Sequence, residues 1–467
     1  MTEVRIALLG IAIGLSACAP WMARAGTCHV SPSGTHLSPY DSWATAATTI
    51  QAAVDAAIDG DVVLVSNGVY NTGGRVIAGT LANRVAIDKA ILVQSQNGPG
   101  QTFIVGEGRQ GVDAVRCVYL ASGATLAGFT ITNGHTRDFD AEGSEFDHSG
   151  GGILCESTNS LIRDSIVSGC SAGNGGGVSG GTVYRSFLAG NVADNLGGGA
   201  SGASVRQCTL SFGRAGFGGG GASGGIVEAC RVHDNSAGWS GGGVISAAVA
   251  NSVIYDNTAA NGGGTSFCSV RHSTICHNSG YAGSYYDTPV FNSILYYNHG
   301  FNHVGGADDS IAYTCTTPRR ESPYNDVGIL TNEPEFAGAL NRDYRLTSPS
   351  PCIDMGINSE ATPGDIEGNP RPLDGDGDGE QTADLGAYEF WRLSLVESNG
   401  TYSLSWPSAS NSTYAVSVST NLPAGFSAIQ SNVWGAPPCN LYPVGSNIHA
   451  ATFFRIHLED YRIHMEN

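Results

Sequence analysis

The sequence is poor in charge and almost without lysine. Only 13% of its 467 residues are charged, the formal net charge is −19, and Lys89 is the one lysine among 22 basic residues. Proteins that bind nucleic acid need a basic stripe to meet the phosphates. The sequence has no such stripe and therefore argues against a nucleic-acid partner.

Long hydrophobic runs are absent after the N-terminal 25 residues. Residues 6–19, IALLGIAIGLSACA, form an apolar run too short to span a membrane comfortably. Residues 23–25, ARA, supply a small-x-small cleavage pattern. We therefore expect residues 1–25 to be a signal peptide and the mature chain to be secreted or at the cell surface, without a transmembrane segment. Alternatively, residues 15–18, LSAC, resemble a lipobox that would place a lipid on Cys18.

Zinc and redox motifs are also missing. The 12 cysteines show neither paired CxxC nor Cys/His spacing. Cleavage after Ala25 would leave 11, an odd number, so at least one would stay free or pair between molecules. Most are expected to be small buried apolar residues.

Glycine, in contrast, is abundant and periodic. The chain has 66 glycines without a Gly-X-Y period, and 41% of its residues are hydrophobic, which excludes collagen and argues against a disordered linker. Glycine triplets end at intervals of 21–25 residues, at Gly152, Gly177, Gly199, Gly221, Gly243 and Gly264. A period near 22 is too short for helical-pair repeats and fits one coil of a solenoid.

A second element keeps the same period. It has an apolar column of Ile166, Leu188, Leu210, Val232, Ile254, Ile275 and Leu295. Two residues earlier lies a mostly small column of Asp164, Ser186, Cys208, Cys230, Ser252, Ser273 and Ser293. Three residues after the apolar column comes Gly169, Asn191, Gly213, Asn235, Asn257, Asn278 and Asn298. Small-x-apolar alternation indicates strands, and Gly and Asn suit bends with φ > 0. We predict an all-β right-handed parallel β-helix in which the asparagines stack.

The flanks complete a three-part organisation. Residues 48–70 read as an amphipathic helix and a strand that would cover the first coil, as terminal repeats require. The aperiodic residues 333–390 are expected to cap the far end. Alternating strands follow in residues 391–467. The expected divisions are residues 1–25, the β-helix with its caps at 26–390, and a small β-sandwich at 391–467.

Residues 26–390 resemble the secreted bacterial right-handed parallel β-helix proteins of the pectate-lyase-like superfamily. TIQAAVDAA and GVY are typical of it, and the glycine triplets and FLAGN are similar to repeats of polymorphic outer-membrane proteins. The resemblance implies the fold. It leaves the chemistry open, because the superfamily includes lyases, hydrolases, esterases, adhesins and inert scaffolds. No catalytic motif of these families is found intact.

Residues just after the apolar column should point outward. Arg231, His233, Asp234 and Asp256 form our candidate catalytic set, with Tyr255, His277, Tyr296 and Tyr297 as candidate substrate contacts. Successive coils rise by roughly 4.8 Å, so the two aspartates should stack near the ~5–5.5 Å separation of retaining glycosidases. Alternatively, they form a solvated acidic ladder, since any stacked pair in a solenoid has this spacing.

An aromatic trace accompanies a neighbouring corner. Phe217 and Trp239 are 22 residues apart, and Tyr281, Tyr285 and Tyr286 follow two coils later. Exposed rings in line would make a sugar-stacking platform. Alternatively, they cover a core thinned by glycine.

Two acidic loops are candidate calcium sites. Residues 137–152 contain Asp138, Asp140 and Glu142, and residues 374–380, DGDGDGE, contain Asp374, Asp376 and Asp378. Hard oxygen ligands at this density suit Ca²⁺, although solvated loops remain the alternative.

Two functions are compatible with the sequence. One is binding, with or without cleavage, of an extracellular polysaccharide, for which a neutral glycan suits an acidic chain better than a uronate. The other is a non-catalytic cell-surface scaffold or adhesin.

Overall fold

The structure is a computed structural model that describes residues 25–77, 79–138, 144–306, 310–318, 326–407, 413–419, 427–436, 439–445 and 452–458. The predicted signal peptide before Ala25, Cys18, Asp140 and Glu142 lie outside these residues. None of the helices in the described part of the chain has the length and apolarity needed to cross a membrane.

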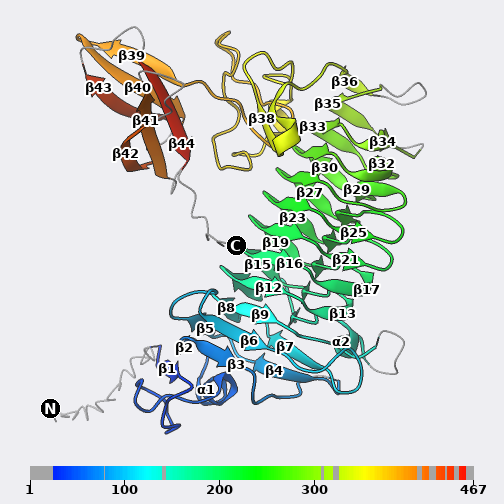
Figure 1. Ribbon diagram of the computed structural model, residues 1–467, viewed down its shortest axis with the longest axis vertical. Coiled ribbons are helices and arrows are strands. Elements are labelled where there is room, and N and C mark those ends of the chain that lie inside the picture. The colour runs from blue at the N-terminus through cyan, green and yellow to red at the C-terminus, as the bar shows by residue number, and fades with distance from the viewer. Residues whose placement is uncertain are drawn as a thin grey trace, which may run out of the picture.

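Sheet A, the largest sheet, is parallel and has 22 strands (Figure 1). Its first strands are β1 (Thr27–Val30), β2 (Val62–Val65), β3 (Gly68–Tyr70), β5 (Leu92–Ser95), β6 (Thr102–Val105), β8 (Thr125–Ala127), β9 (Thr130–Thr132), β11 (Leu161–Arg163), β12 (Ile166–Ser168), β15 (Thr182–Tyr184), β16 (Phe187–Ala189), β19 (Ser204–Arg206) and β20 (Thr209–Ser211). It continues with β23 (Ile226–Glu228), β24 (Arg231–His233), β27 (Ala248–Ala250), β28 (Val253–Tyr255), β30 (Ser269–Arg271), β31 (Thr274–Cys276), β33 (Val290–Tyr296), β35 (Ile311–Thr316) and β36 (Val327–Leu330).

Two further parallel sheets form other sides of the coils, the smaller of them in four coils only. Sheet B contains β4 (Ala82–Ile87), β7 (Val115–Leu120), β10 (Ile153–Cys155), β14 (Val178–Ser179), β18 (Ala200–Ser201), β22 (Ala222–Ser223), β26 (Val244–Ile245), β29 (Gly262–Ser266), β32 (Ser279–Tyr285) and β34 (His299–Val304). The four-stranded sheet contains β13 (Ser171–Asn174), β17 (Val192–Leu196), β21 (Arg214–Ala215) and β25 (Ser236–Ala237). The predicted fold, a right-handed parallel β-helix, is confirmed.

The apolar column fills the core. Leu188, Leu210, Val232, Ile254, Ile275 and Leu295 pair in register and are at most 1% exposed. Our alignment was wrong by one residue in the earliest coil, because Val167 rather than Ile166 pairs with Leu188. Ser165 therefore takes the small position, and Asp164 lies in a left-handed bend at φ 52°.

The asparagine column forms the predicted ladder. The Oδ1 of Asn257 accepts hydrogen bonds from the backbone N and the Nδ2 of Asn235 at 3.0 and 2.9 Å, and Asn278 does the same for Asn257 at 3.0 Å. These amides are buried and do not make the bend. The residue before each of them does, with φ near 55° at Asp234 and Asp256. Our placement of the bend was therefore one residue late.

The glycine triplets pack backbone against backbone between coils. A Cβ on Gly199 would lie 2.5 Å from the Gly221 carbonyl oxygen, and one on Gly221 would lie 2.7 Å from that of Gly243. Larger residues would separate the coils, so the triplets set the close approach that the sequence predicts.

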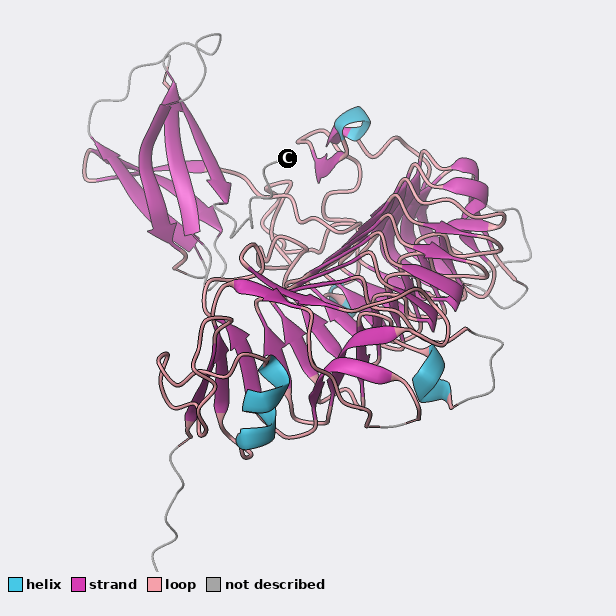
Figure 2. Cartoon of the chain, turned by 60° about the horizontal axis from the view of Figure 1, so that its bottom comes forward, coloured by secondary structure: helices cyan, strands magenta, loops and turns pink. Residues whose placement is uncertain are grey.

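The N-terminal end is covered by α1 (Ile50–Ala56), as expected (Figure 2). Thr49 caps it by accepting the Ala52 N–H at 3.3 Å, and the helix buries Ile50 and Val54 against β1, β2 and β4. A second helix, α2 (Glu145–His148), follows the acidic loop.

Residues 333–390, named here the flank segment, pack against the last coils of the solenoid. The segment contains β37 (Phe336–Gly338), η1 (Ala339–Asn341), β38 (Asp343–Leu346) and η2 (Asn358–Glu360), and it lies along the outer face of sheet A. Asn251 Nδ2 donates to Gly364 O at 2.9 Å, and Asn292 Nδ2 donates to Ile357 O at 3.0 Å. The segment has buried apolar residues of its own, such as Tyr344, which need a partner surface, and the last coils provide it.

The remaining strands form a small antiparallel sandwich. One sheet has β39 (Ser394–Ser398), β40 (Thr401–Pro407) and β43 (Cys439–Gly445), and the other has β41 (Thr413–Ser419), β42 (Ser427–Trp434) and β44 (Phe453–Leu458). Leu404, Trp406, Tyr414 and Val416 fill the space between them.

All eleven cysteines of the described residues are free thiols, and ten of them are buried. They behave as the small core residues that the sequence predicts. Cys208 and Cys230, for example, occupy the small column, 3% and 0% exposed.

Candidate functional site

We call the residues that directly follow the apolar column, together with the bend residue after each, the outward column. Four adjacent strands of sheet A carry it. Strand pairing places His233 beside Tyr255, Tyr255 beside Cys276, and Cys276 beside Tyr296. The next residue of each coil makes the left-handed bend, with φ of 54–58° at Asp234, Asp256, His277 and Tyr297. Asp, Asn and His tolerate this conformation better than most side chains, which explains part of the acidic pattern without invoking chemistry.

The two predicted catalytic aspartates do not face each other as a free pair. Asp234 Oδ2 lies 2.7 Å from His233 Nδ1. Asp256 is held from the other side, because Arg342 Nε and Nη2 donate to its two oxygens at 2.6 and 2.7 Å. A bidentate guanidinium occupies both carboxylate oxygens, so the geometry gives no support to a retaining carboxylate pair.

Strand β38 of the flank segment covers two of the predicted substrate contacts, Tyr255 and His277. Tyr344 is 1% exposed, and its hydroxyl lies 3.0 Å from His277 Nδ1. Its ring centroid is 5.7 Å from that of Tyr255. Burial, with repulsion from Arg342 second, lowers the pKa of His277. Tyr296 is also buried, so these side chains serve the internal packing.

Arg231 and His233 remain at the margin of this covered area. His233 stacks on Tyr255 with centroids 4.9 Å apart, and Phe212 meets its edge at 6.2 Å. Arg231 is exposed and hydrogen-bonds Tyr388. Burial raises the pKa of Tyr255 to about 12. Phe212 is 60% exposed at a left-handed bend with φ of 54°.

Sequence reasoning missed the residues that close this face. Arg342 and Tyr344 lie 86 and 67 residues beyond their partners in a segment without a period. No local signal places them there. Phe212 was missed too, although it continues the bend positions of Asp234 and Asp256 with the same spacing of 22 residues.

We expect Asp256→Asn to reduce stability rather than abolish a catalytic activity. The two side chains of the Arg342–Asp256 pair are 34% and 26% exposed, so solvent weakens the pair and the loss should be about 1 kcal/mol. Chemical denaturation of the variant checks this value. Asp234→Asn is the matched control, because the side-chain hydrogen bond of Asp234 among the described residues is to its neighbour His233, and the variant should change stability less.

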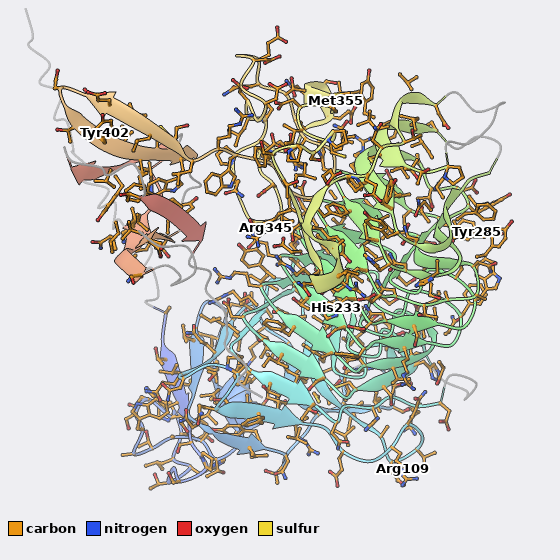
Figure 3. All side chains as sticks on the ribbon, turned by 45° about the horizontal axis from the view of Figure 1, so that its top comes forward. Arg109, His233, Tyr285, Arg345, Met355 and Tyr402 are labelled. Carbon is orange, nitrogen blue, oxygen red and sulfur yellow. The ribbon has the colours of Figure 1, made fainter. Side chains whose placement is uncertain are left out.

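A second candidate surface is an unbroken row of aromatic rings on the side of the solenoid formed by sheet B, named here the aromatic strip. Its members are Phe217, Trp239, Phe267, Tyr286, Tyr285, Tyr281 and Phe301. Consecutive centroids are 4.8–6.1 Å apart. Tyr285 projects from the outer margin of the solenoid (Figure 3). The structure therefore brings together five rings that the sequence singled out and adds Phe267 and Phe301.

Five of the seven rings of the strip are exposed, whereas Phe267 and Tyr285 are half-buried, and the exposed rings do not all offer the same surface. Trp239 is 38% exposed and lies between Phe217 and Phe267 at interplanar angles of 20° and 21°. Both faces of its ring are therefore partly used within the stack. Tyr286 is 44% exposed and turned by 63° to Phe267, and Tyr281 is 53% exposed and turned by 70° to Phe301. These two rings do not share their faces with a parallel neighbour.

One acidic loop gathers carboxylates from two segments. Ligand oxygens of Asp354, Asp374 and Asp376 lie within 4.8 Å of one another. Asp354 Oδ2 accepts the N–H groups of Gly375 and Asp376 at 3.0 and 2.7 Å, while its buried Oδ1 has no hydrogen-bond partner. Two of the three predicted ligands thus meet, and Asp354, 20 residues upstream, takes the place expected for Asp378. Three carboxylates with an oxygen, Asp354 Oδ1, that accepts no hydrogen bond from the described residues suit a hard cation such as Ca²⁺. In the other acidic loop, Asp138 is the one predicted ligand within the described residues.

We expect Ca²⁺ to raise the melting temperature of the protein by several degrees. A cation bound only by the folded chain stabilises it by mass action. Scanning calorimetry with millimolar CaCl₂ and with a chelator measures the shift, and Asp354→Asn should remove it. Asp138→Asn is the control. An equal shift in both variants would contradict this site.

The calcium effect should depend on pH. Burial first, and then repulsion from the Asp376 and Asp374 carboxylates, raise the pKa of Asp354 from 3.8 to about 6. A raised carboxyl pKa means that the folded chain holds this proton more tightly than the unfolded chain. Without metal, the stability that protonated Asp354 contributes to the fold is therefore lost as pH rises through about 6. Calcium needs the deprotonated form. The Ca²⁺-induced melting shift should therefore be small at pH 5 and large at pH 7.5.

No protein-family model matches the chain, and no curated protein matches it significantly. Solved structures with some similarity include the pectate lyase Pel9A, at 14% identity and a TM-score of 0.44, covering 78% of this chain and 97% of the lyase. A rhamnogalacturonan lyase matches at 12% identity and 0.33, covering 78% and 96%. The PL6 alginate lyase AlyGC matches at 11% identity and 0.31, covering 68% and 59%. The likeness concerns the fold alone. The strand pairing itself makes the chain a parallel β-helix protein.

Proposed function

We propose that the protein is an extracellular polysaccharide-binding protein that holds its ligand along the aromatic strip. The observation that carries the proposal is the continuous ring contact from Phe217 to Phe301 on an exposed surface. Monomeric proteins rarely expose contiguous apolar patches of this kind without a binding role. Tyr and Trp offer an apolar body together with a polar edge, as the C–H faces and hydroxyl groups of a sugar chain require.

Binding without cleavage is favoured by the outward column of sheet A. The Asp256 carboxylate is occupied by Arg342, and β38 covers Tyr255 and His277. The candidate catalytic group that stays accessible is the His233–Asp234 pair beside Arg231. This arrangement supports the scaffold or adhesin alternative, with the glycan as the attached ligand. Export through residues 1–25 is part of the same proposal.

Co-sedimentation of the full chain with insoluble polysaccharides tests the proposal. Cellulose, xylan and mannan serve as neutral polymers and calcium pectate as an acidic one, and the supernatants are assayed for new chain ends. We expect retention on at least one neutral polymer without new ends. Retention on none of them would reject the proposal, and new ends lost in His233→Ala would replace binding by catalysis.

A further inference from the structure

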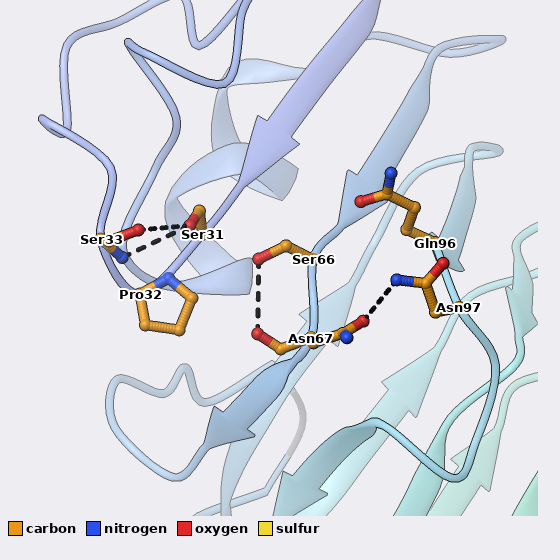
Figure 4. Close-up of a pocket in the computed structure, with 7 residues that line it drawn as sticks. All are labelled: Ser31, Pro32, Ser33, Ser66, Asn67, Gln96 and Asn97. Carbon is orange, nitrogen blue, oxygen red and sulfur yellow. Dashed lines mark hydrogen bonds between the residues drawn. The ribbon is translucent and has the colours of Figure 1, made fainter.

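A hollow of about 540 Å³ lies over the first coils (Figure 4). It is lined by Ser31, Pro32, Ser33, Ser66, Asn67, Gln96 and Asn97. Its volume is in the range of small-molecule sites, about 300–1,000 Å³. None of the sequence motifs pointed to it.

The backbone explains why polar side chains meet here. Val30, Val65 and Ser95 pair in register at the ends of β1, β2 and β5. The next residues, Ser31, Ser66 and Gln96, therefore follow one above the other at roughly the 4.8 Å strand spacing.

One longer connection, between β5 and β6, distinguishes the coils at the hollow from later ones. Residues 96–101 separate β5 from β6, whereas residues 185–186 alone separate β15 from β16. At the bends of two later coils the side chains form an ion pair instead, with Arg185 Nη2 2.8 Å from Asp164 Oδ1. The wall of the hollow is also fixed, because a Cβ on Gly68 would lie 2.8 Å from Pro32 Cγ.

The lining carries hydrogen-bonding groups but no ionisable side chain. Asn97 Nδ2 donates to Asn67 Oδ1 at 2.8 Å, and Ser31 Oγ lies 3.1 Å from Ser33 Oγ (Figure 4). This pairing leaves Asn67 Nδ2 as a donor and Asn97 Oδ1 as an acceptor. The exposed Gln96 amide adds one group of each kind.

We infer that this hollow is a binding site for a neutral sugar residue. Vicinal hydroxyl groups donate and accept at once, which matches the alternating donors and acceptors of the Asn67, Gln96 and Asn97 amides. An anionic ligand would find no lysine or arginine in the lining and would meet a chain of net charge −19. Pro32 supplies one apolar wall for the C–H groups of the ring. The inference concerns a site separate from the aromatic strip.

NMR titration of the full chain with soluble hexasaccharides tests the inference. The probes are cellohexaose, xylohexaose and mannohexaose, with hexagalacturonate as the anionic comparator. We expect at least one neutral probe to shift the amide signals of residues 31–33, 66–67 and 96–97, and Gln96→Ala/Asn97→Ala to weaken its binding at least fivefold. Asn159→Ala, an exposed amide elsewhere, is the matched control and should bind normally.

The outcomes separate this site from the proposed function. Neutral probes that leave these signals unmoved, or that bind no more weakly to the double variant, would overturn the inference, as would preferential binding of hexagalacturonate. Polymer retention that depends on the aromatic strip could still hold in that case. Conversely, a variant of the strip should lose polymer retention and keep hexasaccharide binding at the hollow.

Discussion

Replacing Tyr281 and Tyr286 together with alanine should weaken polysaccharide binding by about ten- to hundredfold. Both rings are exposed, and both are turned out of the parallel stack. Aromatic anchors at binding surfaces each contribute more than about 1 kcal/mol, and about 1.4 kcal/mol corresponds to a factor of ten in affinity. The measurement is a binding isotherm on the neutral polymer that retains the wild-type protein.

Three controls sharpen this experiment. Tyr281→Phe/Tyr286→Phe keeps the rings and should keep most of the affinity. Leu340→Ala removes an exposed apolar side chain, 90% exposed, from outside the aromatic strip and should have no effect. Trp239→Ala is expected to lose less affinity than the tyrosine pair, because its faces are shared with Phe217 and Phe267. Full affinity in the double alanine variant would place the ligand elsewhere.

Replacing Arg371 with alanine should cost about 3–5 kcal/mol of unfolding free energy. Its Nε donates to Glu389 Oε2 at 2.7 Å, and the two side chains are 0% and 1% exposed. Nη1 also donates to Asn251 Oδ1 at 3.1 Å, so Arg371 pairs with Glu389 within the flank segment and also joins that segment to the solenoid. Removing one partner of a buried pair leaves an uncompensated charge, whose cost is of this order. Urea unfolding measures the loss.

Matched variants distinguish the buried charge from a general effect of losing arginine. Arg75→Ala removes an exposed pair with Asp55 and Asp88 and should cost less than about 1 kcal/mol. Arg371→Met/Glu389→Leu removes both buried charges and should recover much of the stability. A cost below 1 kcal/mol for Arg371→Ala alone would show that the pair does not hold the flank segment.

The solenoid could be predicted because the same contacts between neighbouring coils repeat at a fixed spacing in the sequence. A small residue, an apolar residue and, in most coils from residue 186 on, an asparagine recur at fixed spacing, and each makes the same kind of contact with the coil next to it. The repeat even contained the left-handed bend, although sequence alone placed it at Asn235 rather than at Asp234. The alignment was wrong at Ile166 because an insertion before this coil breaks the 22-residue period. The pairing with the neighbouring strand, which the sequence does not show, decides the register there.

The candidate site could be predicted only where it belongs to the repeat. Phe217 and Trp239 were found by their spacing, whereas Phe267 and Phe301 sit at different points of their coils and reach the same row through the bends. The partner of Asp256 was invisible, because Arg342 comes from an aperiodic segment that folds back over three coils. Asp354 joined Asp374 for the same reason. Long-range contacts of aperiodic segments carry no sequence period.

The flank segment changes how the last coils respond to force. Coils of a solenoid contact only their neighbours, so a pull on one end would ordinarily peel them off one at a time. Here Asn251, His272 and Asn292, from three successive coils, are each hydrogen-bonded to the same segment. The chain leaves that segment at Phe390, whose N–H is held by Asp384. Tension transmitted from the sandwich therefore loads several coils in shear at once, and the solenoid ends in a mechanical clamp.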